Sequence, residues 1–283
     1  KYGLKLKERE EFVVRPIDTG SFMHEVIDEF FENTKNIKTI EDQEIKEIVN
    51  NIIDEKLSLS KNYIFTSTPR FAVLTNILKK AILQSITYIV QQMKNSDFEI
   101  AGNEIEFNRK IDNVEITGKI DRIDTAQNEQ GKYIRIIDYK SSDRSINLNE
   151  LEAGTQIQLL TYLDTAVEKT KNIPVGMLYF NLIDPVIKAS RNLTDEQIQE
   201  ELKKQFRMSG MVLAEVNIIR MMDKNLQTGA SSTIPVTLDK NGDIMDSRSN
   251  AITKEQFTLL QNKVKKIIKQ IAKEILEGNI EIK

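Results

Sequence analysis

A chain of 283 residues that is 40% hydrophobic and 29% charged, with no run near the roughly 18 apolar residues of a membrane helix, suits a soluble globular protein rather than a membrane-spanning one. The absence of cysteine excludes disulfides and thiolate metal sites and favours a reducing compartment, the cytoplasm. The 40 basic and 43 acidic residues give a net charge of −3, so a surface for nucleic acid must be a local basic patch or be completed by another subunit. The chain begins with Lys1 rather than methionine, so we expect it to be cut from a longer protein.

Three helices are predicted in the first third of the chain. The first begins at Asp18 or Thr19, both favoured N-cap residues, and carries His24 together with apolar residues at helical spacing. The second runs from about residue 41 to 57. The third runs from about residue 68 to 94, starts with a cap residue followed by proline, and has an apolar set wide enough to be mostly buried.

Strand patterns follow these helices. Residues 98–107 alternate in part, residues 113–125 alternate well, and residues 133–140 are rich in isoleucine. A helix is predicted over 149–170, and a compact apolar strand over 175–182. The order helix, three strands, helix, strand predicts an α/β fold with an αβββαβ core on a mixed sheet flanked by helices.

The last third of the chain predicts additional helices and a hairpin. Its elements are helices over 194–208 and 211–224, a hairpin over 233–243 with Asn241-Gly242 at its turn, and a helix over 254–277 closed by Gly278. No repeat or low-complexity linker divides the chain, so we expect a single domain over 1–283. It would comprise an N-terminal helical layer with the His24 helix (1–95), a sheet core (96–185) and C-terminal helices with a hairpin (186–283).

Two aspartates and a lysine are predicted to converge on one face of the sheet. An antiparallel pair centred on the turn signal at residues 128–131 matches residues whose numbers sum to roughly 259, which places Asp121 opposite Asp138 with Cβ atoms about 5 Å apart. Lys140 is two residues beyond Asp138 and projects from the same face. This set suits a divalent metal and a phosphate; the alternative is a pair of exposed hairpin acids with a lysine nearby.

The other polar candidates carry less weight. His24 is the only histidine, and although a lone helical histidine is more often structural, its neutral imidazole can be a metal ligand. Gln158 and Tyr162 lie one helical turn apart, either as a polar stripe or as a pair that contacts nucleic acid. Glu104 and Glu106 are disfavoured as an extra metal ligand. No Gly-rich phosphate loop, zinc set or cysteine nucleophile is present.

These motifs resemble a known family. Gly118-x-Ile120-Asp121, Ile137-Asp138-Tyr139-Lys140 and Gln158-x-x-x-Tyr162 look like the RecB-type branch of the PD-(D/E)xK nuclease superfamily. More narrowly, three further segments resemble the C-terminal nuclease domain of the AddB family, the B subunits of bacterial ATP-dependent helicase/deoxyribonucleases. They are Tyr2-Gly3-Leu4-Lys5-Leu6-Lys7-Glu8-Arg9-Glu10, Gly20-x-x-x-His24 and Arg248-Ser249-x-x-Ile252-Thr253-x-Glu255-x-Phe257.

The resemblance implies a restriction-endonuclease-like fold and a role for each site residue. Asp121, Asp138 and Lys140 would be the catalytic residues, and Lys140 would orient or activate the attacking water. His24, Asp121, Asp138 and the main-chain carbonyl of Tyr139 would bind the catalytic metal. That metal would be Mg²⁺, for which Mn²⁺ substitutes, because carboxylate oxygens suit Mg²⁺ and imidazole also suits Mn²⁺.

The resemblance also implies partners and a reaction. Gln158 and Tyr162 would contact DNA, as a single strand from an unwound duplex, and the chain would act as an exonuclease that resects double-strand breaks. Its partners would be the helicase–nuclease A subunit and the remainder of its own protein. The family holds an iron–sulfur cluster through cysteines that this chain lacks.

Two alternative functions stay open from the sequence. The first is a non-catalytic nuclease-fold module that grips DNA or scaffolds a helicase, and the complete Asp/Asp-x-Lys set argues against it. The second is a stand-alone, CRISPR-associated RecB-like exonuclease.

Overall fold

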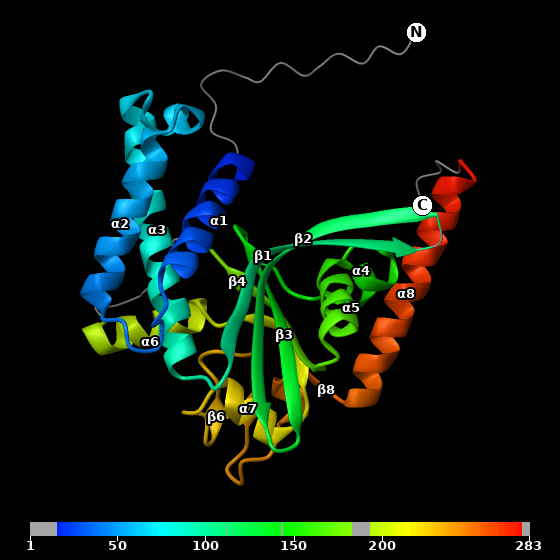
Figure 1. Ribbon diagram of the computed structural model, residues 1–283. Helices are drawn as coiled ribbons and strands as arrows, with labels where there is room; N and C mark the ends of the chain where they lie inside the picture. Colours follow the sequence, from blue (N-terminus) through cyan, green and yellow to red (C-terminus); the bar gives the residue numbers. More distant parts are fainter. Residues whose placement is uncertain (1–15, 112, 143, 183–192, 279–283) are drawn as a thin grey trace.

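A mixed six-stranded sheet flanked by helices organises the chain (Figure 1). The structure, a computed structural model, describes residues 16–111, 113–142, 144–182 and 193–278. The segment Tyr2–Glu10, which contributes to the family resemblance, lies outside the described residues. The strands of the sheet, in spatial order, are β1 (Glu99–Ile111), β2 (Val114–Asn128), β3 (Gly131–Lys140), β4 (Ile173–Asn181), β5 (Ser209–Leu213) and β8 (Ala251–Ile252).

The predicted α/β class and mixed sheet are confirmed. β1, β2 and β3 are antiparallel neighbours, β3 pairs in parallel with β4, β4 is antiparallel to β5, and β5 is parallel to β8. All four strands predicted for the core sheet are present, and each is longer than predicted. The isoleucine-rich β3 lies inside the sheet, and seven of its ten residues are buried.

The prediction of a helix over 211–224 is wrong in its first part. Ser209–Leu213 form β5, and only Val216–Met222 form a helix, α7. A Cβ on Gly210 would come within 2.3 Å of the Met177 carbonyl oxygen, so glycine lets β5 lie close against β4. The gain from pairing with the edge of β4 outweighs the local helical pattern of this short apolar run.

The N-terminal helical layer agrees with the prediction except at two points. Its elements are α1 (Pro16–Asn33), α2 (Asp42–Ser58), the 3-10 helix η1 (Ser60–Thr66) and α3 (Pro69–Lys94). α1 begins at Pro16, before the predicted Asp18, because proline fits the first turn of a helix. α3 is mostly buried only in its later turns; Val73, Leu74 and Ile77 are exposed in its first turns, which lie beside η1, away from the sheet (Figure 1).

The single helix predicted over 149–170 is two helices. α4 (Leu148–Glu152) ends before Gly154, whose φ of +77° lies in the left-handed region. α5 (Gln158–Thr170) begins six residues after α4 ends. Glycine adopts this conformation without the Cβ penalty, so it breaks the helix here. The break makes Gln158 the first residue of α5.

The C-terminal region contains α6 (Asp195–Gln205) and α8 (Lys254–Leu276), both confirmed, and each begins at a threonine capping box. The predicted turn at Asn241-Gly242 is present, but the hairpin around it is reduced to a bridge between Leu238 and Ile244. The remaining short elements are β6 (Gly229–Ala230), β7 (Thr237–Leu238) and the 3-10 helix η2 (Asp246–Arg248). β7 pairs with β6 instead. Among the described residues, no helix combines the length and apolar character that crossing a membrane requires.

A fork between β2 and β3 sets the geometry that matters for function. Their pairing runs from Asn128 and Gly131 at the turn to Arg122 and Ile137, which is the predicted register. β3 stays paired with β4 as far as Lys140, while β2 stays paired with β1 and continues with it as a long hairpin that passes over α5 toward α8 (Figure 1). The two strands therefore separate immediately after Arg122 and Ile137.

Candidate active site

Asp121 and Asp138 lie at the fork, one residue beyond the last pair of the β2–β3 ladder. The predicted register therefore places them across from each other on separating strands. Asp121 Oδ2 accepts a hydrogen bond from the main-chain N–H of Tyr139 at 2.8 Å, which fixes this carboxylate against β3.

A third carboxylate continues this arrangement onto β1. The neighbours of Glu104 pair with Arg122 and Ile120, so Glu104 lies across from Asp121. We call Glu104, Asp121 and Asp138 the acid row. Glu104 has a φ of +49°, a left-handed conformation that is uncommon for a residue with a Cβ and is often found at functional sites.

From the sequence, Glu104 is disfavoured as an extra metal ligand, whereas the structure places it beside His24 and Asp121. The signal that would have found it is the register of the β1–β2 hairpin, because a tight turn after Ile111 places residue 104 opposite residue 121. Glu106, which the sequence also disfavours as a metal ligand, lies two residues further along β1 and pairs with Lys119.

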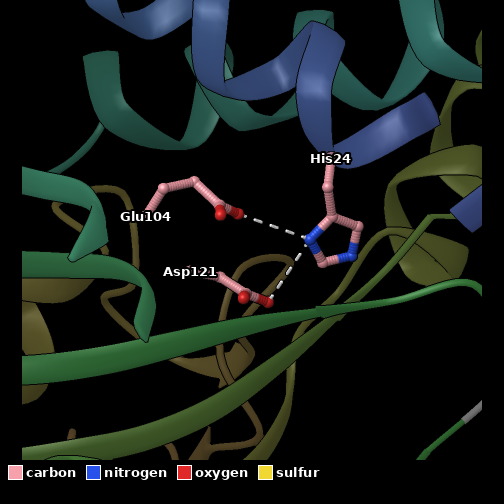
Figure 2. Close-up of side chains that lie close together, drawn as sticks. All are labelled: His24, Glu104 and Asp121. Carbon is pink, nitrogen blue, oxygen red and sulfur yellow. Dashed lines mark ion pairs between the residues drawn. The ribbon is translucent and has the colours of Figure 1, made fainter. Parts of the chain in front are cut away.

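His24 reaches the acid row from α1 (Figure 2). Its Nδ1 lies 3.6 Å from Glu104 Oε1 and 3.7 Å from Asp121 Oδ2. Burial lowers the pKa of His24, but the hydrogen bond to Glu104 and the charge of Asp121 outweigh burial, so the pKa is raised overall. Ligand atoms of these three residues all lie within 4.8 Å of one another, a spacing that suits a shared cation.

Asp138 is the most buried member of the acid row, with none of its surface exposed. Its Oδ2 lies 2.6 Å from Lys140 Nζ, and its Oδ1 has no hydrogen-bond partner among the described residues. Burial raises the pKa of Asp138. Burial, followed by the nearby charge of Asp138, raises the pKa of Asp121 to about 7. The protein therefore does not fully compensate the negative charge that it buries here.

Lys140 links the acid row to α5. Its Nζ donates a hydrogen bond to Gln158 Oε1 at 3.1 Å, and Gln158 Nε2 donates to the Tyr162 hydroxyl at 3.0 Å. The structure thus joins Asp138, Lys140, Gln158 and Tyr162 in one continuous chain of polar contacts. Gln158 stands at the start of α5, which is why its amide reaches the end of β3.

A cavity of about 590 Å³ opens over these residues, between α1, the three strands of the acid row and α5. Its charged lining residues are Glu25, Asp28, Glu104, Lys119, Asp121, Asp138 and Lys140. The five acids outnumber the two lysines, and this excess of acidic side chains favours a cation inside the cavity.

The family model of the PD-(D/E)XK nuclease superfamily matches residues 1–283. The chain belongs to this superfamily. Its fold, a mixed sheet flanked by helices, is consistent with the restriction-endonuclease-like fold that the sequence predicts.

Several relatives of this nuclease domain share one description, the B subunit of an ATP-dependent helicase/deoxyribonuclease. The relative from Clostridium novyi (strain NT) is 37% identical over 305 residues, covering 100% of this chain and 27% of that protein. The relative from Acetivibrio thermocellus is 36% identical over 303 residues, covering 99% and 26%, and that from Clostridium kluyveri is 35% identical over 303 residues with the same coverage. The chain therefore spans about a quarter of the length of these relatives.

The donor set of the PD-(D/E)XK nuclease site fits a divalent cation. The acid row offers hard oxygen ligands, His24 adds an imidazole, and the buried Oδ1 of Asp138 lacks another partner among the described residues. An iron–sulfur cluster does not fit this chain, which has no cysteine to hold it. Ligation by the main-chain carbonyl of Tyr139 stays a prediction.

Proposed function

We propose that this chain is a divalent-metal-dependent deoxyribonuclease domain, an exonuclease that hydrolyses phosphodiester bonds of single-stranded DNA. The observation that carries the proposal is the acid row, in which three neighbouring strands bring carboxylates side by side and the buried Asp138 keeps an oxygen without a partner among the described residues. A site that needed only to fold would pair or hydrate these charges.

His24, Asp121 and Asp138 would hold the metal, Mg²⁺ or in its place Mn²⁺, with the main-chain carbonyl of Tyr139 as a further ligand. We add Glu104 to this set because its Oε1 lies beside the same His24 nitrogen that Asp121 faces. When bound, a divalent cation lowers the pKa of its water and offsets the negative charge that develops on the phosphoryl group.

Lys140 would act on the attacking water and on the scissile phosphate rather than on the metal. Asp138 and Gln158 hold its ammonium at the cavity, where it can orient the attacking water and stabilise the oxygens of the scissile phosphate as their charge grows. Gln158 and Tyr162 continue this line with neutral donors, which suit contact with the DNA backbone.

The setting of the reaction follows from the names of the relatives. Their description as the B subunit of a helicase/deoxyribonuclease supports a helicase–nuclease A subunit and the remainder of the chain's own protein as partners, with DNA unwound by the complex as the substrate. We place this complex in the cytoplasm and assign it to the resection of double-strand DNA breaks. In this proposal residues 1–283 act as a single nuclease domain. Because the chain has a net charge of −3, partner subunits supply the basic surface that attracts DNA.

The decisive experiment replaces Asp138 with asparagine, which keeps its shape and removes its charge. We expect Asp138→Asn to lower the rate of cleavage of end-labelled single-stranded DNA in Mg²⁺ by about 10³-fold or more, since it removes a metal ligand and the partner of Lys140. The thermal melting curve should show a folded protein. Asp42→Asn, at an exposed position on α2 that does not line the cavity, is the matched control and should cleave as the wild type does.

Wild-type cleavage by Asp138→Asn would overturn this assignment. A wild-type chain that binds single-stranded DNA but cleaves it in neither Mg²⁺ nor Mn²⁺ would instead establish the non-catalytic scaffolding function.

A further inference from the structure

The two lysines of the acidic cavity are not equivalent. Lys140 lies against Asp138 with 27% of its side chain exposed, while Lys119 is 52% exposed and pairs with Glu104 Oε2. Lys140 is held inside by a buried acid and by Gln158. Lys119 is therefore the positive charge that an anion outside the cavity meets first, and the reaction proposed above leaves it without a role.

A second groove begins at Lys119. It has a volume of about 550 Å³ and runs along the β1–β2 hairpin, away from the acid row. Its lining consists of Glu106, Phe107, Asn108, Thr117, Gly118 and Lys119. Lys119 lines both this groove and the catalytic cavity, so the two spaces meet at its side chain.

Two cross-strand pairs of the β1–β2 hairpin form the walls of this groove, and one further pair lies between them. Glu106 pairs with Lys119, and Asn108 pairs with Thr117. Because side chains alternate along a strand, these four project from the same face as Glu104 and Asp121. The groove is thus a continuation of the face that carries the acid row.

The middle pair of the groove lies between its two walls. Phe107 pairs with Gly118, and the Phe107 ring lies 2.7 Å from the position that a Cβ on Gly118 would take. That position points to the opposite face, where the ring also packs edge-on against Tyr162 at 5.5 Å between centroids. Neither residue of the middle pair therefore projects a side chain into the groove.

We propose that this groove is a second nucleotide subsite, which holds the part of the single strand next to the scissile phosphate, and that Lys119 binds the phosphate between the two subsites. The inference rests on the nuclease function proposed above. Two residues of a strand span about 6.8 Å, so Lys119 lies about one nucleotide of extended single strand from Asp121. Asn108 and Thr117 supply neutral polar groups at the far wall, and the bare floor leaves room for a sugar–phosphate backbone.

The charges of the lining residues indicate that Lys119 is the residue that binds the phosphate. Among the residues that line the groove, Lys119 is the only cation and Glu106 the only acid. In the catalytic cavity five acids repel the strand, so the groove can attract a phosphate only through this ammonium. When the strand binds, Lys119 exchanges its carboxylate partner, Glu104, for a phosphate and so remains paired.

The test measures binding of a fluorescent single-stranded oligonucleotide by anisotropy, in chelator so that nothing is cut, across a series of salt concentrations. We expect Lys119→Met to raise the Kd about five- to tenfold. The slope of log K against log salt should become shallower by about 0.7, the value for one phosphate contact on a single strand. Lys119→Arg should restore most of the affinity and the slope. Lys132→Met makes the same change at an exposed position on β3, at the opposite end of the sheet, and should bind as the wild type does.

A second variant tests the groove apart from the lysine. Thr117→Glu places a negative charge on the far wall, next to the strand, and should weaken binding at low salt while the melting curve stays that of a folded protein. If Thr117→Glu binds with wild-type affinity, the strand does not run along this groove and the subsite is rejected.

The outcomes separate this inference from the proposed function. If the wild-type chain cleaves DNA while Lys119→Met keeps the wild-type Kd and salt slope, Lys119 serves only as the partner of Glu104. The subsite is then wrong and the nuclease function stands. If the wild-type chain neither binds nor cleaves single-stranded DNA, the proposed function fails and the subsite fails with it.

Discussion

Strands β2 and β3 bury acidic side chains in two contrasting ways within a few residues of each other. Asp124 is fully buried, and its carboxylate accepts hydrogen bonds from Arg122 at 2.6 and 2.8 Å and from Arg135 at 2.9 Å. Burial alone raises the pKa of Asp124, but the two arginines outweigh it and hold the pKa below its usual value. Asp121 and Asp138, on the other face of the same strands, have raised pKa values.

This difference distinguishes a charge that serves the fold from charges that serve a ligand. We call the Arg122–Asp124–Arg135 cluster closed, because its one carboxylate is paired with two guanidinium groups. The Arg135 guanidinium also lies 4.6 Å from the centre of the Phe98 ring, although its Nη1 has no hydrogen-bond partner among the described residues. The acid row is open: Lys140 pairs with Asp138 and Lys119 pairs with Glu104, but burial still leaves the pKa values of Asp121 and Asp138 raised. Mutations should therefore have opposite effects on stability at the two places.

The largest expected effect on stability is at the closed cluster. Asp124→Asn would leave two buried guanidinium groups without their carboxylate, and breaking a buried ion pair in this way costs about 3–5 kcal/mol. Urea unfolding should show this loss in the free energy of unfolding. Asp121→Asn, the matched change on the same strand, should not destabilise the chain in the absence of divalent cations. A loss below about 1 kcal/mol at Asp124 would mean that the two clusters do not differ as described.

The second prediction uses pH to separate the two kinds of acid. Because the pKa of Asp121 is raised to about 7, the folded chain holds a proton that the unfolded chain releases near pH 4. The free energy of unfolding should therefore fall as the pH rises from about 4 to about 7. The raised pKa values of Asp138 and His24 act in the same direction, while the contribution of Asp124 is lost only on acidification, as the pH falls through its lowered pKa.

Thermal melting in chelator between pH 5 and pH 8 measures this effect. We expect the Tm of the wild type to fall by several degrees over this range and Asp121→Asn to flatten the dependence. Added Mn²⁺ should restore the Tm at pH 8 more than at pH 5, because a carboxylate must be deprotonated before it can bind a metal. Equal pH dependence in the wild type and in Asp121→Asn would show that the charge of the acid row is already compensated.

The sequence was sufficient to predict the centre of the site because that centre depends on local rules. The Asn128–Gly131 turn sets the register of β2 against β3, and the register alone brings Asp121 to Asp138. Strand alternation then adds Lys140. The helices with clear capping signals, such as α3 at Thr68, also begin where the sequence places them.

The parts that the sequence did not predict depend on contacts between distant segments or on the backbone conformation of one glycine. Ser209–Leu213 became a strand because the edge of β4 was available, and α5 became separate from α4 because Gly154 adopts a left-handed conformation. The closed cluster was also missed. Alternation shows that Arg122 and Asp124 share a face of β2, but only the packing of α3 and of Phe98 against that face makes it the buried one.

The smallest expected effect concerns Asp28, an acid of the cavity that belongs neither to the Arg122–Asp124–Arg135 cluster nor to the acid row. It faces the cavity over the acid row from α1, one turn after His24, and burial followed by the charges of Glu32 and Glu104 raises its pKa to about 6. Its Oδ1 is buried and has no hydrogen-bond partner among the described residues. At pH 8 the ionised carboxylate should therefore destabilise the fold, but by less than about 1 kcal/mol because solvent screens a partly exposed group.

Asp28→Asn should consequently raise the Tm slightly at pH 8 and leave it unchanged at pH 5, where the wild-type side chain is already protonated. Asp42→Asn, at an exposed position outside the cavity, should show no such difference between the two pH values. A gain of equal size at both pH values would trace the effect to packing rather than to charge. The charge of Asp28 would then play no part in the stability of the fold.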